Sequence, residues 1–402
     1  MMNVLFLCGI YPPDHKEEIF RNSKKGYQFA AQNFQQAIVE GFIQNDVAVS
    51  VVSDPFISTF PLGYKKPYIN FGPSKINGKA PVAPSSFINI PFLKQLSNRT
   101  KQEVFNWCRS NVAEKELHIL VYSLNAHLMK IAVQAKKKFE NVRLSIIVLD
   151  LPEFMGSNKL YRLLGLKKKD TDFIYNNIGC FDHFVLLTEA MSDRLHIEKD
   201  KYCVVEGIFN FNKEYTERTD LLEEGTETIL YTGALARKYG IETLLKAFSS
   251  IENQGYRLII CGDGEAKELV EEYSRRDPRI QYKGKVPHEL IVSYQKQASL
   301  LINPRGPGGE YTQFSFPSKT MEYFASGTPV LMYRLPGVPA AYFDHCYTID
   351  ETNETALADK ITEVLSKPHV ERAGLGRSAS GFIINEKNAE KQVRKIIDLI
   401  AG

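Results

Sequence analysis

One run in the second half of the sequence, SFPSKTMEYFASGTPV, combines residue types that could hold a nucleotide. Pro317 and Ser318 are typical of a helix start, so Lys319 falls in the first turn. A first-turn lysine is unfavourable for the helix dipole unless an anion such as a phosphate lies beside it. Glu322 follows one turn later on nearly the same face, and its carboxylate can accept two hydrogen bonds from vicinal ribose hydroxyls. The alternative is a Lys/Glu ion pair on a solvated helix.

Three further places put small residues between a strand and a helix, an arrangement that presents backbone N–H groups to an anion. They are Gly9 to Pro13, Gly233 to Gly240 and Gly262 to Gly264. One such turn is weak evidence, because glycine there is often needed only for packing or for a positive φ. Their recurrence at the same relative places in the two halves of the chain is a stronger indication of function.

The elements that must position these residues alternate between strands and helices. Strand-like apolar runs include NVLFLCG, VAVSVVS, HILVYS and LSIIVLD in the first half, and TILYTGA, YRLIICGDG, SLLINPR and TPVLMYR in the second. Runs that are apolar on both faces indicate parallel sheets covered by helices. The sequence therefore predicts an α/β fold of two Rossmann-like domains that face one another across a cleft, with ligands outside the carboxyl ends of the strands.

A length of 402 residues fits two domains. The polar stretch NKEYTERTDLLEEGTE after Val205 is interpreted as their linker. We predict one domain over residues 1–205, completed by about 380–402, and another over 206–379. Residues 55–99 lapse into proline, glycine and polar types, which predicts a long loop that either shapes an acceptor site or is a variable surface insertion.

Composition and charge exclude several classes of protein. Six isolated cysteines and eight histidines show no zinc spacing, so we predict a cytoplasmic protein without a metal. No apolar stretch is long enough to span a membrane, and the first residues are interpreted as a buried strand rather than a signal peptide. No basic stripe or motif predicts nucleic-acid binding.

The positive charge is concentrated in the first half of the chain. Residues 1–205 hold 26 Lys plus Arg against 19 Asp plus Glu, whereas residues 206–402 hold 24 against 28. The clusters Lys136 to Lys138 and Lys167 to Lys169 either rest on anionic lipid, as a peripheral membrane contact, or form a solvated face.

The second half resembles the donor domain of the family-four retaining glycosyltransferases, of the glycosyl transferases group 1 type. The resemblance rests on TILYTGALARKYGIETLLKAF, LIICGDGE, YKGKVPHELI, LLINPR and SKTMEYFASGTPV. The first half resembles the acceptor domain more loosely, through VLFLCGIYPP, LSIIVLDLPE, LLTEAMSDRL and VVEGIFNF. The resemblance implies a GT-B fold, in which the last helix, NAEKQVRKIIDLIAG, crosses back onto the first domain. It also implies a nucleotide-diphosphate sugar, UDP type favoured, as substrate, with no cofactor.

The resemblance assigns donor-binding roles unevenly. Glu322 matches the second glutamate of the family's E-x7-E motif, which usually holds the ribose, whereas the first glutamate falls on Phe314. Glu310 or Gln313 could take its place. The donor-binding prediction in this part of the chain comprises Glu310, Phe314, Ser315, Ser318 and Glu322.

Both cationic phosphate contacts of the family are replaced in this sequence. The arginine expected after Gly233 is Ala234, and the lysine expected before Gly240 is Tyr239. The available substitutes are Arg237, Lys238, Arg305 and Lys319. We predict that Lys319 and Arg305 are the catalytic cations, because stabilising the leaving diphosphate requires positive charge.

The remaining site predictions lie at strand ends. The backbone at Gly9 and Ile10, and that at Gly262 and Gly264, should face the pyrophosphate or the nucleoside from opposite sides of the cleft. Asp150, at the end of LSIIVLD, is predicted to be catalytic by touching a sugar hydroxyl, or else caps the next turn. His127 merits a test because it follows the strand that ends at Tyr122 and Ser123.

The resulting hypothesis is a metal-independent, retaining transferase of hexosyl type. It would move a sugar from a nucleotide sugar to a glycan or lipid-linked saccharide in bacterial surface polysaccharide or capsule biosynthesis, at the inner face of the cytoplasmic membrane. The alternative is a catalytically silent GT-B scaffold or partner subunit, suggested by the loss of both phosphate contacts and of the first motif glutamate.

Overall fold

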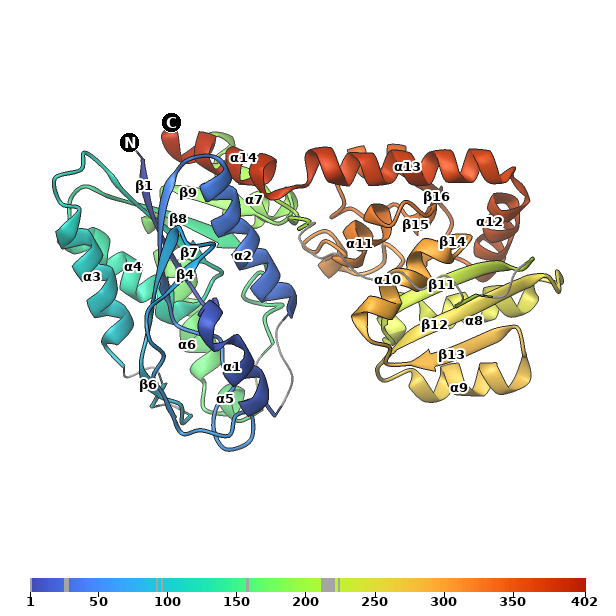
Figure 1. The fold of residues 1–402 in the computed structure, drawn as a ribbon, viewed down its shortest axis with the longest axis horizontal. Helices are drawn as coiled ribbons and strands as arrows, with labels where there is room; N and C mark the ends of the chain where they lie inside the picture. The colour runs from blue at the N-terminus through green and yellow to red at the C-terminus, as the bar shows by residue number, and fades with distance from the viewer. Residues whose placement is uncertain are drawn as a thin grey trace. The chain divides into compact units, whose positions relative to one another are not determined.

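Buried apolar strands form a separate, mostly parallel sheet in each half of the chain (Figure 1). The computed structural model describes residues 2–24, 29–91, 93–94, 97–156, 159–210, 221–222 and 225–402. The chain divides into a first unit, Met1–Asn210 with Ala389–Gly402, and a second unit, Phe211–Asn388. The predicted boundaries were 205 and 379. Much of the predicted linker, residues 212–220 and 223–224, lies outside the described residues.

The first unit is built on an eight-stranded sheet in the order β10-β9-β8-β7-β1-β2-β5-β4, in which only β4 runs antiparallel to its neighbour. Its strands are β1 (Asn3–Cys8), β2 (Ala48–Ser53), β4 (Ser74–Ile76), β5 (Ala80–Pro84), β7 (Leu117–Tyr122), β8 (Val142–Val148), β9 (His183–Leu186) and β10 (Tyr202–Val204). The central strands β1 and β7 are almost wholly buried, as their continuous apolar runs require.

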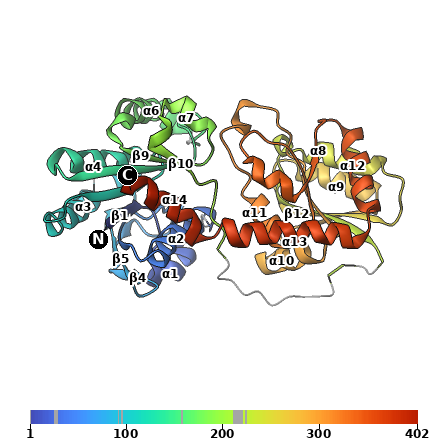
Figure 2. The same ribbon diagram turned by 90° about the horizontal axis from the view of Figure 1, so that it is seen from above.

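Helices connect these strands and cover the sheet. They are η1 (Pro13–His15), α1 (Lys16–Asn22), α2 (Phe29–Gln44), α3 (Arg99–Ser110), α4 (Ala126–Lys138), α5 (Lys159–Leu163), α6 (Leu166–Asn177), η3 (Ile178–Cys180), α7 (Ala190–Leu195), η4 (Lys199–Lys201) and α14 (Ala389–Ala401). The last helix, α14, packs on α2, and Val393, Ile396 and Ile400 join the core of the first unit (Figure 2). This confirms the prediction that the last helix returns to the first domain.

The segment after β2 is more ordered than the predicted loop. Besides β4 and β5, it contains β3 (Tyr68–Ile69) and β6 (Phe87–Ile88), which pair as a separate antiparallel ribbon. Its apolar side chains form a second core with α1 and the chain before it: Tyr11, Ile19, Ile57, Tyr64, Ile69, Phe71 and Phe87. The prediction of a loop without strands is therefore wrong, because this core orders the short strands.

The second unit has a six-stranded, wholly parallel sheet in the order β13-β12-β11-β14-β15-β16. Its strands are β11 (Glu227–Ala234), β12 (Tyr256–Asp263), β13 (Ile280–Gly284), β14 (Leu300–Asn303), β15 (Val330–Tyr333) and β16 (Tyr347–Ile349). Its helices are η5 (Arg237–Tyr239), α8 (Ile241–Ser250), α9 (Lys267–Arg276), α10 (His288–Gln297), η6 (Glu310–Thr312), α11 (Lys319–Ala325), η7 (Ala340–His345), α12 (Glu354–Ser366) and α13 (His369–Glu386).

Both units thus have the doubly wound arrangement, and the predicted class of two Rossmann-like domains is confirmed. In the second unit the strand order reverses between β11 and β14, and in the first unit it reverses between β1 and β7. Ligands of such sheets bind where the order reverses, at the carboxyl ends of the strands. Among the described residues, no helix is long and apolar enough to cross a membrane.

Candidate functional site

The loops after β11 and β14 meet at the point where the strand order of the second unit reverses. Gly240 has a positive φ of 79°, and a Cβ atom placed there would lie 1.9 Å from the carbonyl oxygen of Pro304. Only glycine allows this approach. The contact brings the residues before Gly240 beside those that follow Pro304.

A buried arginine, Arg305, lies at this junction. It is only 6% exposed, and its Nη2 donates a hydrogen bond to Ser315 Oγ at 2.5 Å. The guanidinium carbon lies 4.8 Å from the ring centroid of Tyr311 and 5.7 Å from that of Tyr239. Within the described part of the chain, its Nε has no hydrogen-bond partner and no carboxylate forms an ion pair with it. Among the residues that the structure describes, the positive charge of Arg305 is therefore offset only by a hydroxyl and two rings.

Lys238 adds a second cation to the same group. Its Nζ lies 5.2 Å from the ring centroid of Tyr239 and 5.6 Å from that of Tyr311, and Tyr311 donates its hydroxyl hydrogen to the Lys238 carbonyl at 3.1 Å. Ser315 donates to the carbonyl of Tyr311 at 2.8 Å, which holds the serine against Arg305. We call Lys238, Tyr239, Arg305, Tyr311 and Ser315 the arginine cluster. The sequence prediction named Lys238, Arg305 and Ser315, and the structure brings them together.

The two tyrosines were missed as functional residues. Tyr239 was noted only as a departure from the family's lysine, and Tyr311 was not considered. An aromatic residue at a position where a cation is expected could have signalled a cation–π contact with a cation from elsewhere in the chain.

Lys319 and Glu322 form an ion pair with each other, 2.6 Å between Nζ and Oε2, at the start of α11. Helix α11 is fixed beside β11 because Tyr323, one residue later, is buried and its hydroxyl accepts a hydrogen bond from the Thr232 amide at 2.7 Å. The pair is half-exposed, so a ligand could reach both side chains. The ion pair is the alternative raised from the sequence, and a nucleotide would have to displace or share it.

Several other predicted donor residues have structural explanations. A Cβ at Gly262 would lie 1.8 Å from the Gly233 carbonyl oxygen, and one at Gly264 would lie 2.5 Å from that of Leu235, so packing alone requires both glycines. The side chain of Arg237 forms an ion pair with Glu242.

Phe314 occupies the position of the family's first motif glutamate, and the structure shows the surroundings of this position. Phe314 is buried, so its side chain packs inside the unit and does not present a surface to a donor sugar. Glu310 is exposed at the start of η6, and Ser318 is exposed directly before α11 without a side-chain capping bond. Glu310 therefore remains available to a ligand in place of Phe314.

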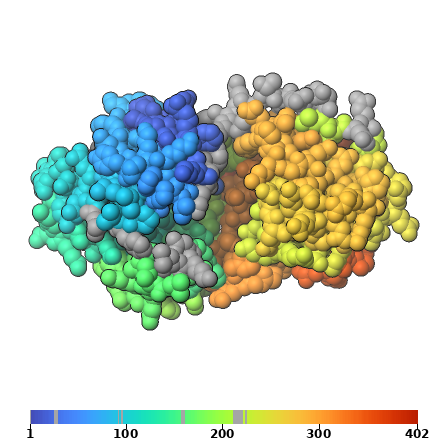
Figure 3. Space-filling view, turned by 90° about the horizontal axis from the view of Figure 1, so that it is seen from below, coloured from blue at the N-terminus to red at the C-terminus, as the bar shows by residue number. Residues whose placement is uncertain are grey.

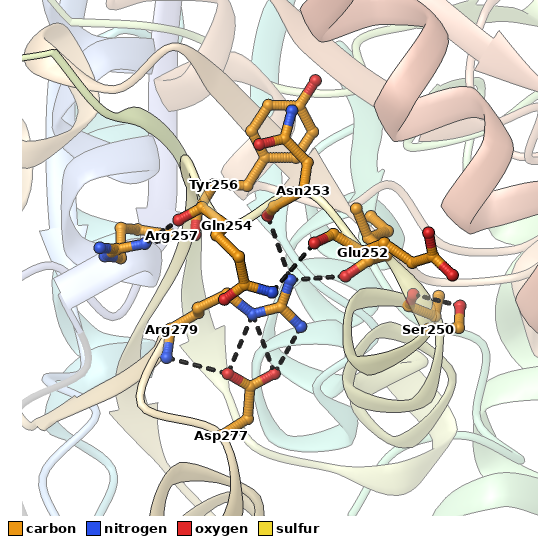
Figure 4. A network of polar contacts seen from close by, with 10 residues as sticks. Ser250, Glu252, Asn253, Gln254, Tyr256, Arg257, Asp277 and Arg279 are labelled. Carbon is orange, nitrogen blue, oxygen red and sulfur yellow. Dashed lines mark hydrogen bonds and ion pairs between the residues drawn. The ribbon is translucent and has the colours of Figure 1, made fainter.

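A buried arginine elsewhere in the second unit provides a contrast (Figure 4). Arg279, 7% exposed, donates from Nε and Nη2 to the carboxylate of Asp277 at 3.0 and 2.7 Å, and from Nη1 to the carbonyls of Ile251 and Asn253. Its guanidinium carbon also lies 5.1 Å from the ring centroid of Phe248. This group lies before β12 and β13, at the amino ends of the strands.

In the first unit, the turn after β1 is closed by two buried glutamines of α2. The Gly9 amide donates to Gln35 Oε1 at 2.8 Å, the Tyr11 amide donates to Gln32 Oε1 at 2.6 Å, and Ile10 is buried with its carbonyl bonded by Ser53. The Gly9 amide is thus already satisfied inside the unit. The prediction that it meets a pyrophosphate would require this bond to be exchanged.

Asp150 is exposed beyond the end of β8, yet desolvation raises the pKa of its carboxyl above the usual range. No hydrogen bond from Asp150 to the following turn is found among the described contacts, although the Phe154 and Met155 amides both bond the Leu151 carbonyl. Because Asp150 is exposed at the end of a strand, its carboxyl can reach a ligand, and its contact with a sugar hydroxyl stays a prediction.

His127, which the sequence analysis named only as worth a test, lies beside Asp54 at the carboxyl ends of β2 and β7. His127 Nε2 lies 3.8 Å from Asp54 Oδ2, and Ser85 donates to the other carboxylate oxygen of Asp54 at 3.2 Å. Desolvation lowers the pKa of His127, although Asp54 opposes this shift. Burial also lowers the pKa of the Lys94 ammonium group, which donates hydrogen bonds to the carbonyls of Pro55 and Ile57. A neutral histidine beside a carboxylate can accept or relay a proton.

Among the described residues, no group of three or more His, Cys, Asp or Glu residues could hold a metal ion.

A polar cavity of about 690 Å³ opens in the first unit between α1 and the pair Lys65 and Lys66. Three acidic residues of the chain around α1 also line it: Asp14, Glu17 and Glu18.

Comparison with known proteins adds a family for the second unit. Residues 213–379 match the family described as "Glycosyl transferases group 1". The match covers most of the second unit and none of the first. No curated protein matches the sequence.

Solved structures show the same fold over the whole chain. HepE of Anabaena in complex with UDP has a TM-score of 0.63 at 13% identity, with all of both chains covered. Sucrose-phosphate synthase of Thermosynechococcus elongatus has a TM-score of 0.63 at 16% identity, with 99% of this chain and 98% of that chain covered. The lipopolysaccharide outer core galactosyltransferase WaaB has a TM-score of 0.56 at 14% identity, with 100% and 99% covered. At these identities the likeness supports the GT-B fold.

Proposed function

We propose that the protein is a retaining glycosyltransferase that takes a sugar from a nucleotide-diphosphate sugar, UDP type favoured, and passes it to a glycan or lipid-linked saccharide. The observation that carries this proposal is the arginine cluster at the strand-order reversal of a unit most of which matches the group 1 glycosyltransferases. A buried arginine without a carboxylate is costly, and the negative charge of a diphosphate would offset that cost. HepE, solved with UDP, has the same fold and supports the choice of nucleotide.

In this proposal the cations act on the leaving group. Arg305 and Lys238 would stabilise the charge that develops on the diphosphate as the bond to the sugar breaks. Lys319 would exchange its partner Glu322 for a phosphate, which would free Glu322 to accept hydrogen bonds from the ribose. The departing phosphate oxygen would take the acceptor's proton on the same face of the sugar, so that the anomeric configuration is kept. No metal takes part in the proposed reaction.

Nucleotide binding is the first test. Purified protein is heated with UDP, GDP, ADP, CMP or dTDP, and the unfolding midpoint is compared with that of the free protein. A ligand at 100 times its dissociation constant adds about 2.7 kcal/mol of stability, which is readily measured as a shift. We expect one diphosphate to give a shift that Arg305→Ala, Lys319→Ala and Glu322→Ala reduce. Arg275→Ala, which removes an exposed cation from the far end of α9, is the matched control.

The alternative function is a catalytically silent GT-B scaffold. The replacements Ala234, Tyr239 and Phe314 at the family's contact positions favour it. A protein that is folded and shows no shift with any of the five nucleotides would support the scaffold over the transferase. If a nucleotide sugar is turned over, the anomeric proton coupling of the product in NMR decides between retention and inversion, and turnover in excess EDTA tests metal independence.

We also propose where in the cell the reaction takes place. Surface polysaccharide assembly on the inner face of the cytoplasmic membrane would bring a lipid-linked acceptor to the enzyme. In that case the basic first unit would make the peripheral contact with the membrane.

A further inference from the structure

Asp54 and His127 lie near the strand-order reversal of the first unit, at the ends of the two strands that flank β1. In the sheet order β7-β1-β2, Asp54 directly follows β2, and His127 lies in the first turn of α4, which follows β7. His127 Nε2 and Asp54 Oδ2 are 3.8 Å apart, and no hydrogen bond joins them among the described contacts. The side chains of His127 and Asp54 are 20% and 15% exposed, so a ligand can reach both. We call these two residues the histidine–aspartate pair.

Contacts with their surroundings hold both residues of the pair in place. The Asp54 amide donates to the Cys8 carbonyl of β1 at 2.9 Å, and Ser85 donates to Asp54 Oδ1 at 3.2 Å. The His127 amide donates to Oδ1 of Asn125, the residue that caps α4, at 3.0 Å. In Figure 3, the residues that follow β2, in blue, lie next to those around α3 and α4, in cyan and teal, on one face of the first unit. A ligand would therefore meet a preformed arrangement.

The turn between β7 and α4 has an uncommon backbone conformation. Ser123, the first residue after β7, has a positive φ of 65°. The other described non-glycine residues with a positive φ are Asp46, Asn77 and His196, whose residue types adopt this region most readily. Residues of other types that are held in this region are found most often at ligand sites. The turn leads directly into the first turn of α4, where His127 lies.

The spacing of the two polar atoms determines which ligand fits between them. One oxygen atom can lie at a hydrogen-bond distance of about 2.8 Å from both atoms. A hydroxyl group can donate its hydrogen to Asp54 Oδ2 and accept the Nε2 hydrogen of a neutral His127. A phosphate would instead meet the Asp54 carboxylate, and the nearby cation Lys94 already bonds the carbonyls of Pro55 and Ile57. The described residues contain no group of three or more His, Cys, Asp or Glu for a metal ion, so the pair suits a hydroxyl group best.

Two other histidines of the described chain have a carboxylate within 4.0 Å, and neither offers the same arrangement. His15 Nδ1 lies 3.4 Å from Glu18 Oε2, and these two side chains are hydrogen-bonded to each other. His118 Nε2 lies 4.0 Å from Glu116 Oε2 at the amino end of β7, and Glu116 also accepts a hydrogen bond from Arg143 at 3.0 Å. Of the three pairs, only the histidine–aspartate pair is both unbonded and at the carboxyl ends of strands, where ligands of such sheets bind.

We propose that the histidine–aspartate pair binds a hydroxyl group of the saccharide acceptor. The proposal rests on the proposed function, in which the departing diphosphate takes the proton of the attacking hydroxyl. The pair would therefore hold another hydroxyl of the acceptor and orient its sugar ring for the reaction. Arg305 and Lys238, the cations proposed to act on the donor diphosphate, belong to the second unit, which leaves the pair in the first unit for the acceptor.

Binding of small saccharides to the full-length protein in the presence of UDP tests this assignment. The probes are methyl β-D-glucopyranoside, methyl β-D-galactopyranoside and methyl α-D-mannopyranoside, each with its monodeoxy derivatives, and saturation-transfer NMR measures their dissociation constants. Asp54→Asn removes the negative charge, His127→Phe removes the donor, and His127→Gln keeps an N–H donor at a similar reach. The matched controls are Glu116→Gln and His183→Phe, at the amino ends of β7 and β9.

We expect at least one probe to bind the wild type. Asp54→Asn should weaken its binding by about 10- to 100-fold and His127→Phe by about two- to tenfold, because a hydrogen bond to a charged group is the stronger one. His127→Gln should recover part of the loss, and the controls should bind as the wild type does. One monodeoxy probe should bind the wild type about as weakly as the intact probe binds Asp54→Asn, and should lose little more in that variant. Thermal unfolding with and without UDP verifies that each variant is folded and still binds the nucleotide.

The assignment would be overturned if no probe binds the wild type, or if the controls lose as much affinity as the variants of the pair. Variants that bind the probes as the wild type does, but turn over the nucleotide sugar more slowly, would make the pair a proton acceptor instead. Weaker binding of UDP-glucose but not of UDP, with unchanged binding of the probes, would assign the pair to the donor sugar. The UDP shift of the wild type separates these failures from failure of the transferase, because it requires no acceptor.

Discussion

Two buried arginines of the second unit differ in what surrounds their charge. Arg279, at the amino ends of β12 and β13, has a carboxylate on two nitrogens, two carbonyls on the third and a phenyl ring beside it. Arg305, after the carboxyl end of β14, has a serine hydroxyl and two tyrosine rings. Both are almost equally buried. Arg279, at one end of the sheet, thus has a carboxylate partner and carbonyl acceptors inside the protein. Arg305, at the other end, is just as buried but has no anion beside it among the described residues.

The third buried arginine of the described residues follows the first pattern. Arg372 on α13 donates from both terminal nitrogens to the carboxylate of Glu227, at 2.8 and 2.6 Å. Arg305 is therefore the exception, and it lies where ligands of doubly wound sheets bind. Burial alone would not have distinguished it, whereas counting the acceptors around each guanidinium does.

The largest expected effect is on stability at Arg279. Arg279→Ala would leave the Asp277 carboxylate and two carbonyls without their donor, and breaking a buried pair in this way costs about 3 kcal/mol. Urea unfolding of Arg279→Ala measures it. Arg305→Ala serves as the comparison, with an expected change within about 1 kcal/mol, because the lost cation–π contacts are offset by removal of an unpaired charge. Equal losses in the two variants would show that the two arginines have the same structural role.

The next effect is on ligand affinity at Arg305. Arg305→Ala should weaken binding of the nucleotide that stabilises the protein by about 10- to 100-fold, since a hydrogen bond to a charged group contributes about 1.5–3 kcal/mol. Isothermal titration calorimetry measures the change. Arg305→Lys keeps the charge but not the planar fork, so it should recover only part of the loss. Unchanged affinity in Arg305→Ala would remove Arg305 from the site.

Lowering the pH should reduce the stability contributed by the Arg279–Asp277 pair and leave that at Arg305 unchanged. Hydrogen bonds from Arg279 hold the pKa of Asp277 below its usual range, and burial opposes this shift. A lowered carboxyl pKa contributes stability above the unfolded value of about 3.9, and this contribution is lost as the pH falls through the folded value.

The difference in unfolding free energy between wild type and Asp277→Asn should therefore be complete at neutral pH and shrink below about pH 4. For Arg305→Ala the difference from wild type should not change in this range, because none of the carboxylates that the structure describes pairs with Arg305. A difference for Asp277→Asn that stays constant into acid would contradict the assigned pKa shift.

The smallest effect concerns the rings. Tyr239→Ala removes one of the two aromatic faces beside Arg305 and Lys238, and a cation–π contact contributes about 0.5–1 kcal/mol. We expect the nucleotide dissociation constant to rise by about fivefold at most. Tyr239→Phe keeps the ring and should bind as the wild type does. If Tyr239→Phe binds the nucleotide as weakly as Tyr239→Ala does, the hydroxyl rather than the ring contributes to binding.

The sequence predicted the central strands of both sheets because these strands are continuous apolar runs, whereas β4 and β5, at one edge of the first sheet, were missed. The segment after β2 was missed for a physical reason: β3 and β6 have two residues each, which is too short for any periodicity to be recognised. Their order comes from Ile69 and Phe87, which enter a core with residues far away in the chain, such as Ile19.

The candidate site was predicted in part. Arg305 and Lys238 could be named because they are cations in the segments that resemble the donor domain, but their shared contact with Tyr239 and Tyr311 could not be predicted. It depends on the approach of Gly240 to Pro304, which sequence spacing does not encode. Conversely, Gly262 and Gly264 looked like ligand contacts, while the structure already requires them for the packing of neighbouring turns. Their contact with a donor stays a prediction.

The return of α14 to the first unit means that two chain crossings, near residues 210 and 388, join the units. A protease that cuts only one crossing leaves a nicked protein whose pieces still sediment together, since α14 stays packed on α2. Release of the second unit requires both cuts. An expression fragment that ends before Ala389 would lack Val393, Ile396 and Ile400 from the core of the first unit, so the first 210 residues alone are a poor choice for isolating that unit.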